Sequence, residues 1–334
     1  MQIEEQSRGD AWMDAVVASV EWPVPDVLVI RLRRSDGMPL PAFEPGAHVA
    51  VECGEQGVRH YSLCGALDDA HSYTLGIKVA ADGRGGSRWI AEQAREGGPL
   101  RISTPRNHFP MEEGAPAYLF LSGGIGITPM LPMLRRLQQL GIRARLVHLC
   151  RTPAEHAFAA WLHELGAFHD IHLHCDSEAG GLYDLEAELQ RAPADASVYC
   201  CGPGRMMSAV QSHGERLGHG NRYHFEFFAP PVASALPSSA TEGSNDAEFV
   251  VVQQSTGREV PVLESETMLA ALRKAGVAVK SECEYGVCGW CATGVVEGTP
   301  RHLDSYLTEK EREANNVVLP CVSRCVGPRI TLAL

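Results

Sequence analysis

Four cysteines near the C-terminal end of the chain have the spacing of a metal-cluster site. Cys283, Cys288 and Cys291 follow the pattern C-x4-C-x2-C, and Cys321 comes 30 positions later. This is the spacing of a plant-type [2Fe–2S] cluster, in which four thiolates hold two irons. The pattern therefore predicts an iron–sulfur site with these four cysteines as its ligands.

Two glycines inside the cysteine loop fit this interpretation. Gly286 and Gly289 have no Cβ, so they let backbone N–H groups approach the cluster sulfides. Two alternatives are weaker. A zinc site would more naturally show two C-x2-C pairs. Cys325 could replace Cys321 as the fourth ligand, but its position in the stretch Ser-Arg-Cys favours a structural role.

A glycine-rich turn between an expected strand and an expected helix gives a second chemical signal. The apolar run at 118–121 is followed by Ser-Gly-Gly-Ile-Gly-Ile-Thr-Pro at 122–129. Thr128 is a plausible helix N-cap and Pro129 a first helical residue. Such a turn at a helix N-terminus suits a pyrophosphate. It lacks the G-x-G-x-x-G fingerprint, so a plain tight turn remains an alternative.

The sequence Cys201-Gly202-Pro203 also follows an expected strand, SVYCC. Ligands of open α/β sheets bind at the carboxyl ends of the strands, so this position supports a nucleotide site. Taken alone, Cys201 is more easily explained as a buried residue than as a functional one.

Two stretches in the first third of the chain suit a flavin. Arg59, Tyr61 and Ser62 offer a fixed cation, an aromatic ring and a hydroxyl at the end of an expected strand. The sequence Gly-Arg-Gly-Gly-Ser at 83–87 precedes the helical run RWIAEQARE and gives a second helix N-terminus suited to a phosphate. Each signal is weak by itself, and their combination predicts a flavin site.

The expected elements divide the chain into three domains and a linker. A chain of 334 residues is too long for one ordinary core. Short strands separated by Gly, Pro and Asp predict a small antiparallel barrel or sandwich over 11–110. Strands alternating with helices predict a parallel-sheet α/β domain over 111–228. A Pro-, Ala- and Ser-rich linker at 229–246 then precedes a hairpin, a helix and the cysteine loop at 247–334.

Composition excludes some classes of partner. The chain has 41 acidic and 29 basic residues, a formal net charge of −12, which argues against nucleic acid as a partner.

The polar N-terminus has no signal-peptide pattern, and no apolar run is long enough for a membrane span. The 11 cysteines are an odd number, and four of them follow a metal-ligand pattern. We therefore expect a cytoplasmic protein in a reducing compartment.

From about residue 11 onward, the chain resembles the phthalate dioxygenase reductase family, a group of flavin reductases that includes vanillate demethylase reductases. The resemblance rests on the motifs RHYSLC, GRGGSRWI, PRNHFP, SGGIGITPM, YCCGP, HFEFF, CEYGVCGWC, DSYLT and LPCVSRC, which occur in the family's order. It implies an antiparallel β-barrel for the flavin, an α/β domain for the nicotinamide coenzyme, and a C-terminal α+β ferredoxin domain of the β-grasp type.

The resemblance also implies cofactors and site residues. The flavin would be FMN, held by Arg59, Tyr61, Ser62, Lys78, Gly85, Gly86 and Ser87. The nicotinamide coenzyme would be held by Gly124, Gly126, Thr128, Cys201, Gly202 and Pro203, and Phe228 would lie near the flavin at the domain junction.

The chain departs from the family's usual pattern at two positions. Trp290 is a bulky residue inside the cysteine loop, where relatives often have a small one. Some relatives carry an acidic residue, suited to a ribose diol, at about Thr152. Its absence weakens the case for NADH over NADPH. The loop 150–158 nevertheless offers only Arg151 as a cation for a 2′-phosphate, which favours NADH.

The resemblance implies a reductase that takes a hydride from NADH onto FMN and passes single electrons through [2Fe–2S] to a Rieske-type oxygenase. Plant-type clusters lie near about −400 mV and Rieske centres between roughly −150 and +300 mV, so the transfer is favourable. A redox-sensing protein is the alternative from another class, and it would show no sustained turnover with NADH. A one-component oxygenase is disfavoured, because neither a Rieske ligand pattern nor a 2-His-1-carboxylate motif is evident.

Overall fold

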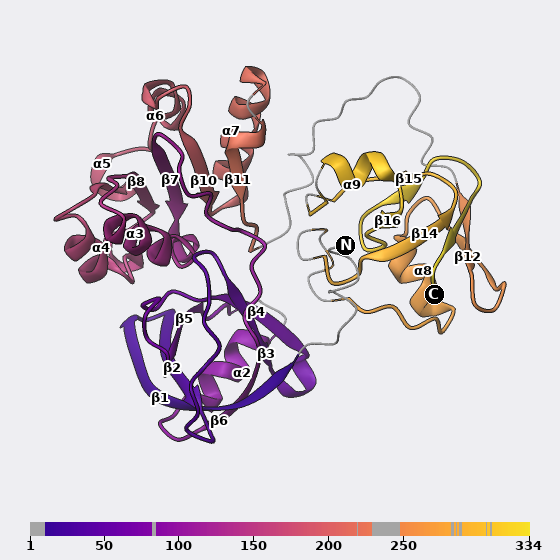
Figure 1. The fold of residues 1–334 in the computed structure, drawn as a ribbon, viewed down its shortest axis with the longest axis horizontal. Coiled ribbons are helices and arrows are strands. Elements are labelled where there is room, and N and C mark those ends of the chain that lie inside the picture. Colours follow the sequence, from indigo (N-terminus) through magenta and orange to yellow (C-terminus); the bar gives the residue numbers. More distant parts are fainter. Residues whose placement is uncertain are drawn as a thin grey trace. The chain divides into compact units, whose positions relative to one another are not determined.

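The computed structural model describes residues 11–81, 85–218, 220–228, 248–281, 284, 286, 289–304, 306–307 and 309–334. It divides into two compact units, Met1–Phe228 and Ala229–Leu334 (Figure 1). The expected linker at 229–246 lies outside the described residues, as do Cys283 and Cys288, two of the expected cluster ligands.

The first unit begins with an antiparallel barrel. Its strands are β1 (Trp12–Val24), β2 (Val27–Arg34), β3 (His48–Glu52), β4 (Val58–Ser62), β5 (Tyr73–Lys78) and β6 (Pro99–Ser103). They pair in the order β4-β3-β6-β1-β2-β5, and a bridge between Leu63 and Leu75 joins the two outer strands. Apolar side chains fill the interior, because alternate residues of each strand point inward. Helix α2 (Gly86–Gln93) contributes Ile90 to this core.

A five-stranded parallel sheet follows in the same unit. Its strands are β7 (Tyr118–Gly123), β8 (Arg145–Cys150), β9 (Asp170–Cys175), β10 (Ser197–Cys201) and β11 (Tyr223–Phe225), in the order β11-β10-β7-β8-β9. Helices α3 (Met130–Gln139) and α4 (Ala159–Leu165) contribute to the core on one face. Helices α6 (Leu185–Arg191) and α7 (Gly204–Leu217) contribute to the core on the other face of the sheet (Figure 1). A short helix, α5 (Asp176–Ala179), follows β9.

The order of these strands creates a switch point. The chain runs outward from β7 to β8 and β9, and then returns to form β10 and β11 on the opposite side of β7. Connections on the two sides of the switch diverge, which leaves a crevice at the carboxyl ends of β7 and β10. A nucleotide site is therefore expected at the turns that follow these two strands.

The barrel packs against this carboxyl edge of the sheet. A Cβ built on Gly76 of β5 would lie 2.6 Å from Phe158 Cζ and 2.8 Å from Thr128 Cγ2. The guanidinium of Arg135 on α3 donates to the carbonyl of Cys64 at 2.7 Å. The turn that follows β7 therefore lies directly against the barrel.

The second unit is a small mixed α+β fold. Its sheet has the order β13-β12-β18-β14-β16, with strands β12 (Phe249–Gln253), β13 (Glu259–Val262), β14 (Thr293–Glu297), β16 (Val317–Val318) and β18 (Arg329–Leu332). The central pair β12 and β18 is parallel, as in a β-grasp fold. Strands β15 (Pro300–Arg301) and β17 (Arg324–Cys325) form a separate pair.

Helix α8 (Met268–Lys274) packs on this sheet, and its first turn is capped by Thr267, whose hydroxyl accepts from Ala270 N at 3.1 Å. A short helix, α9 (Glu309–Ala314), precedes β16. Among the described helices, none is long and apolar enough to cross a membrane.

Candidate functional site

The structure brings together the two turns that were predicted to hold the coenzyme. Strands β7 and β10 are neighbours, with Ser122 paired to Cys201 at their carboxyl ends. A Cβ built on Gly126 would lie 2.2 Å from the carbonyl oxygen of Cys201. A Cβ built on Gly202 would lie 2.9 Å from Gly123 N. Only glycine fits at these two positions, because backbone atoms of the opposite turn occupy the space a side chain would need.

The start of the helix after β7 differs from the prediction. Helical turns begin at Gly124, where a short 3-10 segment (Gly124–Ile127) leads into α3. Thr128 is itself in the helical conformation, and its hydroxyl donates to the carbonyl of Ile125 at 2.9 Å. The prediction of an N-cap at Thr128 is therefore wrong. The backbone N–H groups that open the helix belong to the glycine turn, as a pyrophosphate site requires.

Cys201 ends β10 at this edge of the sheet and is completely buried. Burial raises the pKa of its thiol well above the usual value, so the sulfur stays protonated at neutral pH. A neutral, enclosed thiol suits a positioning role beside the coenzyme better than that of a nucleophile.

The predicted phosphate end of the flavin site also comes together in the structure. Gly85 precedes α2 with a φ of 82°, and a Cβ on Gly86 would lie 2.6 Å from the Arg59 side chain. The guanidinium of Arg59 therefore lies beside the N-terminus of the helix. A cation and the first N–H groups of a helix form a cradle that fits the phosphate of FMN. Ser87 accepts a hydrogen bond from Ala80 N at 3.2 Å, which ties this turn to the end of β5.

The other residues that were predicted to bind or approach the flavin lie in different environments. Tyr61 lies on β4, two residues from Arg59, and packs partly against the barrel core. Lys78 ends β5 and forms an ion pair with Asp26 at 3.3 Å. Phe228 is 47% exposed at the end of the described part of this unit.

Glu226 is a candidate site residue that the sequence interpretation missed. It follows β11, and its carboxylate accepts a hydrogen bond from the Ser62 hydroxyl at 3.3 Å. Burial raises the pKa of Glu226 to about 8, so this carboxyl takes up a proton more readily than an ordinary glutamate does. A single acidic residue in the aromatic run HFEFF was the available signal.

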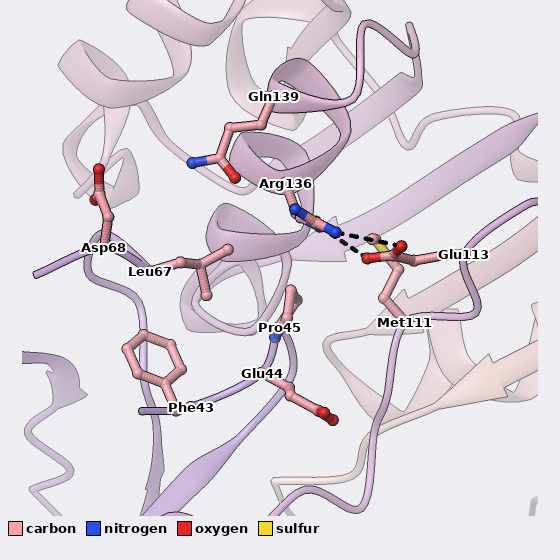
Figure 2. A pocket seen from close by; sticks show the side chains of 9 residues that line it. All are labelled: Phe43, Glu44, Pro45, Leu67, Asp68, Met111, Glu113, Arg136 and Gln139. Atoms are coloured by element: carbon pink, nitrogen blue, oxygen red, sulfur yellow. Dashed lines mark hydrogen bonds and ion pairs between the residues drawn. The ribbon is translucent and has the colours of Figure 1, made fainter. Parts of the chain in front are cut away.

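A surface hollow of about 580 Å³ lies between barrel loops and α3 (Figure 2). Its lining residues are Phe43, Glu44, Pro45, Leu67, Asp68, Met111, Glu113, Arg136 and Gln139. Arg136 donates two hydrogen bonds to Glu113, which leaves two other carboxylates in the lining. An acidic hollow disfavours phosphate groups, so it is a poor place for flavin or coenzyme.

In the second unit, the structure brings together the two predicted cluster ligands that it describes. The sulfur atoms of Cys291 and Cys321 lie 3.3 Å apart, and both residues are buried. Two thiolates at this separation can bind one iron. Cys325 instead donates to the carbonyl of Arg329 at 3.3 Å, and burial raises the pKa of its thiol. This arrangement supports Cys321 over Cys325 as the fourth ligand.

Comparisons with known proteins agree with this arrangement. Residues 251–326 match the 2Fe-2S iron-sulfur cluster binding domain family, and residues 120–212 match the oxidoreductase NAD-binding domain family. The chain is 37% identical to the phenoxybenzoate dioxygenase subunit beta of Ectopseudomonas oleovorans, over 95% of this chain and 96% of that protein.

Two solved structures are also similar. One is phthalate dioxygenase reductase, described as a modular structure for electron transfer from pyridine nucleotides to [2Fe–2S]. It shares 31% identity over 99% of both chains, with a TM-score of 0.67. The other is an intact type IV self-sufficient cytochrome P450 monooxygenase, with 33% identity and a TM-score of 0.82. That match covers 97% of this chain but spans only 41% of the monooxygenase.

Phthalate dioxygenase reductase matches this chain almost from end to end, and the NAD-binding match precedes the 2Fe-2S match along the chain. The resemblance inferred from the motifs is confirmed, as are the antiparallel barrel, the parallel α/β sheet and the C-terminal ferredoxin fold. The chain belongs to the phthalate dioxygenase reductase family of NAD(P)H-dependent flavin and iron–sulfur oxidoreductases.

Proposed function

We propose that this chain is the reductase component of a two-component system, taking electrons from NADH and delivering them singly to a separate Rieske-type oxygenase. The observation that carries the proposal is the meeting of the two glycine turns against the barrel in one compact unit. The paired sulfurs of Cys291 and Cys321 lie in the other unit. Because the ligands are thiolates, we assign the protein to the reducing cytoplasm.

The proposed site residues divide the work between the two units. When bound, FMN accepts a hydride from NADH and the [2Fe–2S] cluster carries single electrons onward. Arg59 and the N-terminus of α2 hold the flavin phosphate, and the turns at Gly126 and Gly202 hold the coenzyme. Glu226 and Ser62 hold a proton where the barrel packs against the sheet.

The proposed domain limits remain those expected from the sequence. They are a flavin barrel at 11–110, a coenzyme domain at 111–228, a linker at 229–246 and a ferredoxin domain at 247–334. The proposed cluster ligands are Cys283, Cys288, Cys291 and Cys321.

Separating the two units tests the proposal. A chain ending at Phe228 keeps both cores of the first unit, so it should bind FMN and oxidise NADH with ferricyanide at a rate close to that of the full chain. It should fail to reduce cytochrome c or a Rieske oxygenase, because these protein acceptors need the cluster. Stopped-flow rates with each acceptor would measure the difference.

The full chain, with matched flavin content, is the control for this experiment. Undiminished reduction of a Rieske oxygenase by the shortened chain would contradict the proposal. So would a full chain that is bleached by NADH but reduces no protein acceptor, since a redox sensor behaves in that way.

We also propose that NADH is preferred through a pair of residues after β8. Arg151 is the one arginine or lysine between positions 150 and 158. Its guanidinium forms an ion pair with Glu155 at 2.9 Å, and Glu155 also accepts from the Arg151 backbone N–H at 3.1 Å. Glu155 therefore neutralises the Arg151 guanidinium, which would otherwise bind the 2′-phosphate of NADPH. The Glu155 carboxylate also repels that phosphate.

Glu155→Gln should raise kcat/KM for NADPH by about 10-fold and change that for NADH by less than about 3-fold, because only NADPH carries the repelled phosphate. Steady-state kinetics with both coenzymes would measure this. Glu164→Gln makes the same change of charge on α4 and should leave both values unaltered. An equal effect of Glu155→Gln on the two coenzymes would refute the assignment.

A further inference from the structure

Asp304 is an enclosed carboxylate in the second unit, with a side-chain exposure of 0%. One of its oxygens accepts from the backbone N–H groups of Tyr306 and Leu307, at 3.2 and 2.8 Å. The other accepts from the Ser323 hydroxyl at 3.4 Å. These donors replace the water that a buried carboxylate would otherwise need.

The segment around Asp304 presses on the cysteine loop. A Cβ built on Gly286 would lie 3.0 Å from Asp304 Cα, and one on Gly289 would lie 2.0 Å from the Tyr306 ring. Both glycines have a left-handed backbone, with φ values of 72° and 70°. Only glycine fits at these two positions, because a side chain there would collide with this segment.

The same carboxylate reaches the turn that carries Cys321. Ser323 lies two residues after Cys321, and its oxygen also accepts from Leu303 N at 3.2 Å. A Cβ on Gly286 would lie 2.6 Å from Val322 Cγ2, so this turn also touches the loop. Asp304 therefore lies between the cysteine loop and the Cys321 turn: its backbone packs beside Gly286, and its carboxylate accepts from Ser323.

The ion-pair contacts that the structure describes at the Asp304 carboxylate are longer than those of a comparable buried acid, and the Arg312 guanidinium donates to the Asp304 carbonyl instead, at 2.6 Å. Glu188 in the first unit is also buried, but Arg145 donates to it at 2.9 Å. Among the residues that the structure describes around Asp304, the ion-pair partners are farther away, with His302 at 3.7 Å and Arg312 at 3.8 Å.

We propose that Asp304 is a positioning residue for the iron–sulfur site, which holds the cysteine loop against the Cys321 turn and keeps the cluster's reduction potential low. A nearby negative charge disfavours the added electron, and the net charge around a cluster is one of the factors that set its potential. The proposal rests on the cluster assignment of the proposed function and names a residue that tunes that same site.

Asp304→Asn in the full-length protein separates charge from shape, because the amide keeps an oxygen acceptor. We expect full iron and sulfide content and a midpoint potential at least ~59 mV more positive, a tenfold change for one electron. Redox titration followed by EPR measures the potential. Glu259→Gln removes an exposed charge from β13 of the same unit and should leave the potential unchanged. An unaltered potential in Asp304→Asn would overturn the charge role.

Ser323→Ala tests the positioning role separately. It removes a hydrogen bond to Asp304 but keeps the charge, so iron should be lost to a chelator several-fold faster with an unchanged potential. This variant tests the positioning role even if Asp304→Asn does not accumulate as folded protein. An unchanged rate of iron loss from Ser323→Ala would overturn the positioning role.

Neither measurement uses NADH or a partner protein. A failure of electron delivery to a Rieske oxygenase therefore leaves this proposal testable, and a failure here leaves the proposed function standing.

Discussion

Replacing Cys321 by Ser should remove the cluster, whereas replacing Cys325 by Ser should leave it in place. Cys321 lies 3.3 Å from Cys291, sulfur to sulfur, while Cys325 is engaged with the carbonyl of Arg329. The loss of one of four thiolates destabilises a [2Fe–2S] centre. We expect Cys321→Ser to reduce cytochrome c at least roughly 100-fold more slowly, about 3 kcal/mol in the rate-limiting barrier. Ferricyanide reduction should change little.

Iron and sulfide content and the EPR signal of the reduced protein measure the cluster directly. Normal flavin content in both variants shows that the first unit is intact, and it excludes general unfolding as the explanation. The assignment would fail if Cys325→Ser lost the cluster and Cys321→Ser kept it. Equal loss in both variants would mean that the small fold does not tolerate changes in this turn.

The family, the domain order and the fold class could be predicted from the sequence because their signals are local. The cysteine spacing lies within a few residues of one loop, apart from Cys321. The alternation of strands and helices is likewise a short-range pattern, and it predicted the parallel sheet β11-β10-β7-β8-β9. Short strands separated by turn residues predicted an antiparallel barrel or sandwich, and the family resemblance favoured the barrel that the structure has.

Contacts between distant segments could not be predicted in the same way. Ser62 and Glu226 are separated by 164 positions and meet only because the barrel packs on the carboxyl edge of the sheet. Asp304 occurs in the recognised motif DSYLT, but the sequence does not show that its carboxylate reaches Ser323. The start of the helix near Thr128 was missed for a different reason. A threonine before a proline fits an N-cap, and the glycines before it tolerated an earlier helical turn.

Replacing Gly126 by Ala should disable the coenzyme site without disturbing either the flavin or the cluster. The new Cβ would lie 2.2 Å from the carbonyl oxygen of Cys201 and 2.6 Å from its carbonyl carbon. These are backbone atoms of β10, which is paired with both β7 and β11, so they cannot move without shifting the sheet. The two turns must separate, and the crevice between them then loses its shape.

We expect kcat/KM for NADH to fall at least ~100-fold with every acceptor, ferricyanide included, which corresponds to ~3 kcal/mol of lost transition-state stabilisation. Gly181→Ala is the matched control. It makes the same substitution in the same α/β region, where a Cβ would meet no described atom within 4 Å, and it should retain full activity. Steady-state rates, flavin content and iron content measure the outcome. A Gly126→Ala protein that oxidises NADH normally would show that the coenzyme does not bind between these turns, because no coenzyme-binding crevice could keep its function with a side chain forced into the backbone of Cys201.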